Sequence, residues 1–253
     1  PIALNLGKDS VGALCFGLII FFFFKDTDKK IYLDLVESGG MQLLILSGIL
    51  GIGIADSLFL WSLNLLGASL SAIIDCMIVP FVIALSFIFL NETLSVTQFV
   101  GTAIIVFSIF LSTDLKRSSH LTARRLWGGI GVGVLSMAVM ALGIIIMKPV
   151  LSEIPLVHVV FIRLLAGILL LWLNLLFLRN RRRILRSLFA RHGFLYTLSA
   201  SFIGGFVVLL IWMAGFKYAH ASIASALNQM SNVFIFLFAA LILKESVDGK
   251  KII

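Results

Sequence analysis

Two acidic side chains lie deep inside apolar stretches of this sequence, and they are the first candidates for chemistry. We interpret Asp56 and Asp75 as the only acids deep within membrane spans. An ionisable group at mid-bilayer costs about 3 kcal/mol unless it is paired or hydrated. Pro80, one turn after Asp75, removes a backbone hydrogen bond and can free the carbonyl of Cys76. Asp75 could then hold a proton, a cation or an amine solute. The alternative is a structural pairing with a hydroxyl or with Arg163.

Three amide side chains form a second cluster of candidates. Asn228, Gln229 and Asn232 lie within five residues of one another. Asn228 and Asn232 are four residues apart, so they share one side of a helix. Such a row could line a solute cavity. The alternative is hydrogen bonding between helices without contact to a ligand.

One arginine and two tryptophans complete the set. Arg163 lies about two turns into an apolar run. It could bind a carboxylate, neutralise Asp56 or Asp75, or extend its charged end to the membrane surface. Trp61 and Trp212 could stack on a solute, although aromatic belts at the two membrane surfaces are the commoner use of tryptophan.

The composition identifies the class of protein. Of the 253 residues 60% are hydrophobic and 13% are charged, whereas soluble domains average about 25% charged residues. The surplus apolar surface must face lipid. The net charge of +8 comes from basic residues between apolar runs, which is typical of membrane-protein loops and gives no reason to expect nucleic acid as a partner. The sequence has no zinc-ligand spacing, phosphate-binding loop or catalytic triad, so we expect no metal, no cofactor and no enzymatic activity.

Eight apolar runs are long enough, or nearly so, to cross a membrane, which takes about 20 residues. Each must be a helix, because an open strand would leave backbone groups unpaired in lipid. We therefore predict an all-α membrane protein, a multi-pass bundle of about eight helices. The runs are 9–24, 41–65, 68–90, 94–113, 126–147, 156–178, 194–216 and 220–243.

The sequence contains an internal repeat. Ala68–Leu94 aligns without a gap with Ala221–Val247 at an offset of 153, and six of the 27 positions are identical. The most informative pair is Glu92 with Glu245, two helix-end acids that we expect to cap a helix or to pair across the repeat. The repeated segment is the third apolar run in the first copy and the eighth in the second copy, which is five runs later. Because each run crosses the membrane once and five is an odd number, the second copy must enter the membrane from the opposite side. Inverted repeats are typical of secondary transporters, whose solute site lies near the midplane. In this alignment Asn228 is equivalent to Asp75.

These repeated residues carry a resemblance to a known family. The chain resembles the EamA-type domain of the drug/metabolite transporter superfamily, a unit of five helices that is usually present twice. The matching stretches are Ala68-Ser69, Val79-Pro80-Phe81, Leu90-Asn91-Glu92 and Gly101-Thr102-Ala103 in the first copy, and Phe161–Gly167, Ala221-Ser222 and Leu243-Lys244-Glu245 in the second. The chain departs from the family pattern in two places: Val233 stands where the second copy would carry a proline, and Lys8 replaces the arginine in the first copy.

The resemblance implies ten helices, of which the first and the last lie outside this chain. Residues 1–115 would be the first repeat, 116–125 a basic linker and 126–253 the second repeat. It also implies an integral membrane transporter that exports a small metabolite or drug-like solute by alternating access, with a bacterial inner membrane as the expected location and proton coupling among the options. The alternative function is a non-transporting membrane scaffold or receptor-like protein with a dry interior. The sequence leaves the solute and the oligomeric state open.

The distribution of basic residues predicts the orientation in the membrane. Basic residues on loops favour the cytoplasmic side. Family members with both ends in the cytoplasm imply the opposite orientation, but loop charge acts directly on insertion, and we give it more weight. One side of the spans carries 14 of the 20 Lys and Arg residues and the other side five, with Arg163 inside a span; the 14 are Lys8, four within Lys116–Arg125, six within Arg179–Arg191, Lys244, Lys250 and Lys251.

We therefore predict that the Arg-rich loop around residues 179–193 is cytoplasmic. A single cysteine at Ser187, with Cys15 and Cys76 replaced, should resist a membrane-impermeant thiol reagent added outside intact cells and react after the cells are permeabilised. Labelling of intact cells would place the loop outside and show that the family topology holds.

Overall fold

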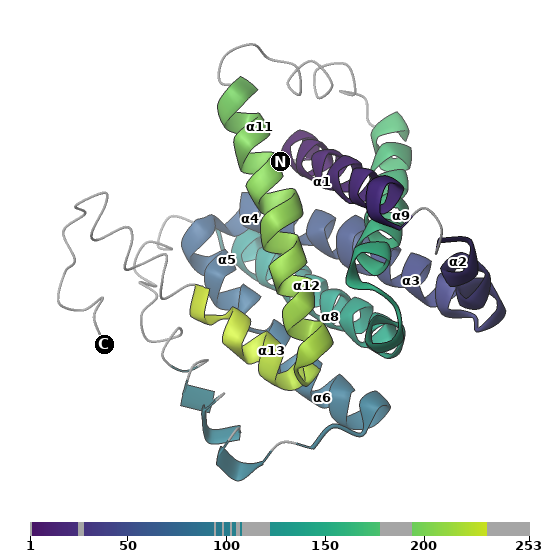
Figure 1. The fold of residues 1–253 in the computed structure, drawn as a ribbon. Coiled ribbons are helices and arrows are strands. Elements are labelled where there is room, and N and C mark those ends of the chain that lie inside the picture. The colour runs from purple at the N-terminus through teal and green to yellow at the C-terminus, as the bar shows by residue number, and fades with distance from the viewer. Residues whose placement is uncertain are drawn as a thin grey trace. The chain divides into compact units, whose positions relative to one another are not determined.

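A computed structural model describes residues 2–24, 28–93, 122–177 and 194–231, together with 95–97, 99–101, 103, 104 and 107. In this part of the chain every regular element is helical (Figure 1). Two of the elements, η1 and η3, are π-helices that continue directly from the α-helices before them. The elements are α1 (Ile2–Phe23), α2 (Asp28–Glu37), α3 (Gly40–Gly48), η1 (Ile49–Ala55), α4 (Asp56–Leu66), α5 (Ala68–Asp75), α6 (Ile78–Leu90), α8 (Ala123–Glu153), α9 (Leu156–Phe177), α11 (Phe194–Phe202), η3 (Ile203–Val208), α12 (Leu209–Tyr218) and α13 (Ala221–Asn228).

Six stretches of the described residues are long and apolar enough to span a membrane, which confirms the predicted multi-pass helical bundle. The Arg-rich loop and about half of each of the predicted runs 94–113 and 220–243 lie outside the described residues, so these two spans stay predictions. The six spans are Asn5–Phe23, Gly40–Leu66, Leu70–Leu90, Ala123–Glu153, Leu156–Phe177 and Leu195–Tyr218.

The first span begins earlier than the sequence analysis placed it. The predicted run 9–24 started after the polar residues Asn5 and Lys8, whereas α1 begins at Ile2 and the span at Asn5. Asp9 is consequently inside a span, and it is only 2% exposed. The interpretation of Asp56 and Asp75 as the only deep acids was therefore wrong. Polar residues can extend a span when other helices cover them, which hydropathy along one segment does not reveal.

The chain forms two compact units. Unit 1 contains residues Pro1–Ser57 and Leu142–Tyr218, and unit 2 contains Leu58–Ala141 and Ala219–Ile253. Each unit therefore takes helices from both halves of the sequence. The chain passes between them three times, inside the continuous spans Gly40–Leu66 and Ala123–Glu153 and between Tyr218 and Ala219.

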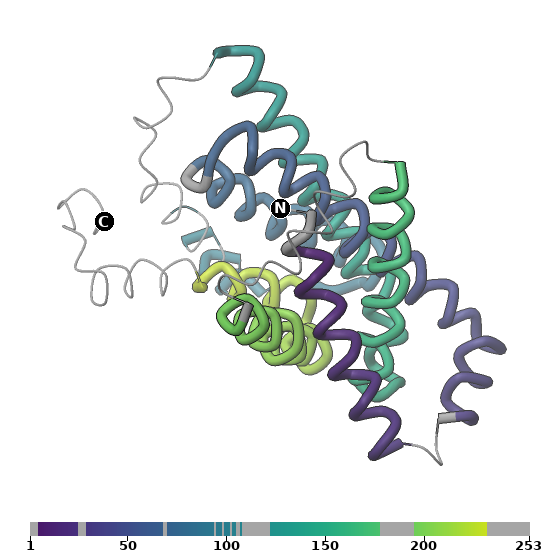
Figure 2. Tube along the Cα trace, turned by 90° about the horizontal axis from the view of Figure 1, so that it is seen from above, coloured from purple at the N-terminus to yellow at the C-terminus, as the bar shows by residue number. Residues whose placement is uncertain are grey.

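Unit 1 is held together by close helix crossings. Helix α1 packs against α9, α11 and η3, and α9 packs against α3 and η1; Figure 2 shows α1, in purple, between α9 and α11–α12. A Cβ on Gly12 would collide with the backbone of Gly205, and one on Gly48 would collide with the backbone of Arg163. Small residues at such crossings let membrane helices approach to backbone contact. Phe16, which is fully buried, meets Phe206 edge-on at 4.9 Å between ring centroids.

Structural features recur along the chain at nearly the spacing of the sequence repeat. Helices α1 and α9 both have 22 residues. The two π-helices, which are rare and are often found at functional sites, begin at Ile49 and Ile203. The eight-residue helices α5 and α13 begin and end at positions related by the offset of 153.

In unit 2 the third predicted run is not one helix. Helix α5 ends at Asp75 and α6 begins at Ile78. The expectation that Pro80 leaves the carbonyl of Cys76 free was wrong, because that carbonyl accepts a hydrogen bond from the backbone N–H of Val79 at 3.2 Å. A bond to the third residue replaces the bond to the fourth that Pro80 cannot make.

Candidate functional site

The structure divides the eight predicted site residues between the two units. Unit 1 contains Asp56, Arg163 and Trp212, and unit 2 contains Trp61, Asp75, Asn228 and Gln229. Asn232 lies outside the described residues.

The central feature of unit 2 is a pair of helix ends that meet. Asp75 is the last residue of α5, and Gln229 directly follows α13, which packs on α6. The side-chain amide of Gln229 donates to the backbone carbonyl of Asp75 and to its Oδ2, both at 3.4 Å. Gln229 is 1% exposed, while Asp75 and Asn228 are half-buried. We call this arrangement of Asp75, Asn228 and Gln229 the paired break.

The backbone at both helix ends turns in the same way. The N–H of Cys76 donates to Ile73 O at 3.2 Å, and the N–H of Gln229 donates to Ala226 O at 3.2 Å. In both cases the α-helical pattern tightens to a bond between residues three apart, which is common at helix ends. The first copy has Pro80 soon after its break, whereas the second copy has Val233 at the equivalent place. The second break therefore forms without a proline.

Asp75 has no cationic partner among the described residues of unit 2. The basic side chains in that part of the chain are Arg124, Arg125 and His220, which lie in the first turn of α8 and at the N-cap of α13. Arg125 donates to the carbonyl of Asn64 at 2.9 Å. The carboxylate of Asp75 is thus met by a neutral amide within the membrane span.

The two tryptophans lie in different surroundings. Trp61 on α4 is 56% exposed. Trp212 on α12 is half-buried and meets Phe216 edge-on, with ring centroids 4.9 Å apart. An exposed tryptophan on a membrane helix is typical of a lipid-facing or interfacial position.

Unit 1 contains a buried ionic network that includes Asp56 and Arg163. The Nζ atom of Lys8 lies 3.5 Å from Oδ1 of Asp9. The amide of Asn5 donates to Oδ2 of Asp56 at 3.3 Å. Asp56 also interacts electrostatically with Lys8 and Arg163. Two acids and two bases therefore compensate one another within this unit.

Arg163 is a buried member of this network, because it is only 3% exposed. Its Nη1 contacts the Sδ atoms of Met147 and Met213. A thioether is a weak acceptor, and Nε has no hydrogen-bond partner among the described residues. Electrostatic attraction to Asp56 is the main compensation for this guanidinium. The sequence analysis missed Asp9, which the adjacent Lys8 could have signalled as a candidate ion pair.

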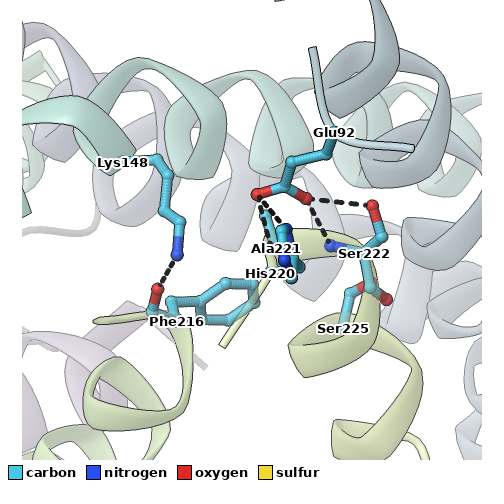
Figure 3. Close-up of polar contacts among 7 residues, drawn as sticks. All are labelled: Glu92, Lys148, Phe216, His220, Ala221, Ser222 and Ser225. Atoms are coloured by element: carbon cyan, nitrogen blue, oxygen red, sulfur yellow. Dashed lines mark hydrogen bonds and ion pairs between the residues drawn. The ribbon is translucent and has the colours of Figure 1, made fainter. Parts of the chain in front are cut away.

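Glu92 binds the N-terminus of α13, as expected for a helix-end acid. Its carboxylate accepts from the backbone N–H groups of Ala221 at 3.0 Å and Ser222 at 3.3 Å, and from the hydroxyl of Ser222 at 3.2 Å. Nδ1 of His220 lies 3.7 Å from Oε1. Figure 3 shows the carboxylate facing this helix end. Asn91, with φ 52°, ends α6 in the left-handed conformation just before Glu92. Glu245 lies outside the described residues.

Lysines join α8 to α12 within unit 1. Lys148 donates to the carbonyl of Phe216 (Figure 3), and Lys217 donates to the carbonyl of Ile154 at 2.6 Å. Each ammonium group binds a carbonyl near the C-terminal end of the other helix, where the helix dipole favours positive charge. The hydrogen bond to Phe216 ties Lys148 to the end of α12.

Comparison with known families agrees with this architecture. The sequence profile of the EamA-like transporter family matches residues 9–113 and again residues 127–253. The chain belongs to the EamA-like transporter family. A search of curated proteins gave no match. Family membership establishes an integral membrane protein of the drug/metabolite transporter type and confirms the resemblance, while the solute and the direction of movement are matters for proposal. Among the described residues of this EamA-like chain, no three His, Cys, Asp or Glu side chains are grouped so as to hold a metal ion.

The contact between Glu92 and α13 generates a prediction about stability. Glu92→Ala should lower the free energy of unfolding by about 1 kcal/mol, the usual cost of losing a side-chain helix cap. Thermal unfolding of the purified protein, followed by tryptophan fluorescence, measures the change. Glu37→Ala is the matched control, because Glu37 is exposed in α2. Equal shifts for the two variants would contradict the capping role.

Proposed function

We propose that this protein moves a small solute across the membrane by alternating access, and that the solute binds at the paired break. Secondary transporters with inverted repeats commonly bind their solutes where interrupted helices meet near the midplane. The observation that carries the proposal is the contact of Gln229 with Asp75. It joins equivalent helix ends from the two copies of the repeat.

The paired break has the chemical groups that a solute site needs. Asp75 and Asn228 are half-buried, so part of each polar side chain stays available for a ligand. Hydrogen bonds tighten the backbone around them on both sides of the break, which positions these groups without filling their remaining bonding capacity. Irregular backbone at membrane depth is tolerated where it is enclosed by protein or lines a cavity.

The alternating movement would have to pass through continuous helices. The chain crosses between its compact units at residues 57–58 and 141–142, inside two of the membrane spans, and at 218–219, between α12 and α13. The first crossing lies just after the π-helix η1. π-helical turns are often found at functional sites, and helices kink at them, which favours bending there. We propose export across a bacterial inner membrane as the physiological direction.

The competing proposal, a non-transporting scaffold with a dry interior, explains the paired break less well. A scaffold gains nothing from a mid-span carboxylate whose partner is an amide, since an ionisable group in a membrane is costly to keep. Replacement of Asp75 by an apolar residue would stabilise a purely structural bundle. A transporter needs a polar group at that depth.

Flux through proteoliposomes tests the proposed function. Vesicles loaded with a bacterial metabolite extract should release one solute or a small group of related solutes faster than protein-free vesicles, as measured by mass spectrometry. Asp75→Asn should slow that release at least tenfold, which corresponds to about 1.4 kcal/mol of lost binding. Asp34→Asn, at an exposed position of α2, should leave the rate unchanged.

A matched unfolding curve separates loss of transport from loss of folding. Asp75→Asn should melt at or above the temperature of the wild type, because it removes a buried charge. If no solute leaves wild-type vesicles faster than protein-free vesicles, the transporter proposal is wrong and the scaffold explanation is favoured. If Asp75→Asn transports at the wild-type rate, the solute site lies elsewhere.

A further inference from the structure

The mid-span acids of the two units are compensated differently. In unit 1, Asp9 and Asp56 share a network with Lys8 and Arg163, so two negative charges face two positive charges. In unit 2, Asp75 has only the amide of Gln229 as its side-chain partner among the described residues. The basic residues of that part of the chain lie at helix ends. The described residues of unit 2 therefore supply no cation to compensate an ionised Asp75.

The backbone around Asp75 adds to the negative potential. Helices α5 and α13 both end at the paired break. The C-terminal end of a helix carries a partial negative charge, because its last carbonyls point away from the helix. In interrupted transporter helices such ends coordinate cations, whereas N-terminal ends face anions. An anionic solute group would meet repulsion here from the carboxylate of an ionised Asp75.

A further acceptor lies one turn before Asp75. Ser71 is 1% exposed, and its Oγ has no hydrogen-bond partner among the described residues. Residues four apart lie on the same side of a helix, so Ser71 and Asp75 share a face of α5. A buried hydroxyl without a partner costs about 1–3 kcal/mol, and a bound donor would recover that energy. Gln229 holds the carboxylate of Asp75 in place through its side-chain amide nitrogen.

We propose that the solute of this transporter carries a positively charged nitrogen, an ammonium group with at least one N–H, and that Asp75 binds it. The N–H donors match the carboxylate of Asp75 and the hydroxyl of Ser71, both of which can accept hydrogen bonds. Ion pairing with Asp75 supplies the compensating charge that unit 1 obtains from Lys8 and Arg163. The inference rests on the proposed transport function and names the chemical class of its solute.

A charge-matched ligand panel tests the proposal. Each set contains a primary amine, the alcohol and the carboxylic acid on one carbon skeleton, for example phenethylamine, 2-phenylethanol and phenylacetic acid, with linear, branched and ring skeletons. Thermal stabilisation of the purified protein in lipid nanodiscs reports binding. We expect stabilisation by amines of at least one skeleton and none by the matching alcohols and acids. Asp75→Asn should weaken the binding of those amines at least tenfold, Ser71→Ala should weaken it less, and Asp34→Asn should not change it.

The outcomes separate this inference from the proposed function. The ammonium class would be overturned if acids or alcohols stabilise the protein, or if no amine stabilises it. Stabilisation by sodium chloride without stabilisation by any amine would also overturn it. An amine that binds Asp75→Asn as tightly as the wild type would also overturn it. If proteoliposomes export a neutral or anionic solute, the ammonium inference fails while the transport proposal stands. If they export nothing, the transport proposal itself fails.

Discussion

The cost of a carboxylate inside a lipid bilayer is the constraint on which this structure depends. Apart from Glu153 at the end of its span, three acids lie within the described spans, Asp9, Asp56 and Asp75, and each must be compensated by the protein. In unit 1, Lys8 forms an ion pair with Asp9, and Lys8 and Arg163 attract Asp56 electrostatically. Unit 2 gives the third only an amide partner. The ionic network of unit 1 needs no ligand, because its acids and bases compensate one another. A carboxylate at a helix break that lacks a cationic partner can instead be compensated by a bound ligand.

The backbone is under a similar constraint, because peptide N–H and C=O groups in lipid also need hydrogen-bond partners. The two helix ends at the paired break keep their hydrogen bonds by tightening to residues three apart. Gln229 then uses its side chain to satisfy a backbone carbonyl of the other copy. At the opposite end of α13, Glu92 accepts the N–H groups that the helix leaves unpaired. An interrupted helix is thus fixed at both ends by residues from the first copy of the repeat.

The sequence predicted those parts of the fold that depend on composition and on the internal repeat. Apolar runs identified the spans, and the ungapped offset of 153 paired Asp75 with Asn228. The partner that touches Asp75 is the next residue, Gln229. The alignment could not choose between adjacent residues, because which side chain reaches across depends on how the helix ends.

Other features depend on contacts between distant segments, and the sequence could not reveal them. Asp9 fell at the edge of its predicted span, because only the packing of α1 against α9 and η3 shows that it is covered. The helix break after α13 could not be predicted from a proline, because Val233 occupies the equivalent position. The π-helices arise where backbones cross at glycine, as at Gly205 against Gly12, and such crossings join residues nearly 200 positions apart.

The central claim is that water and solute reach the paired break from both sides of the membrane in turn. The most direct measurement is the reactivity of a cysteine at Asn228, with Cys15 and Cys76 replaced, toward a small water-soluble thiol reagent applied to either face of reconstituted vesicles. Ser62→Cys is the buried control, because Ser62 is 0% exposed and binds the carbonyl of Gly129. The account predicts labelling at 228 from both faces, protection by the transported solute, and an unreactive control. A cysteine at 228 that stays unreactive from both faces would contradict it.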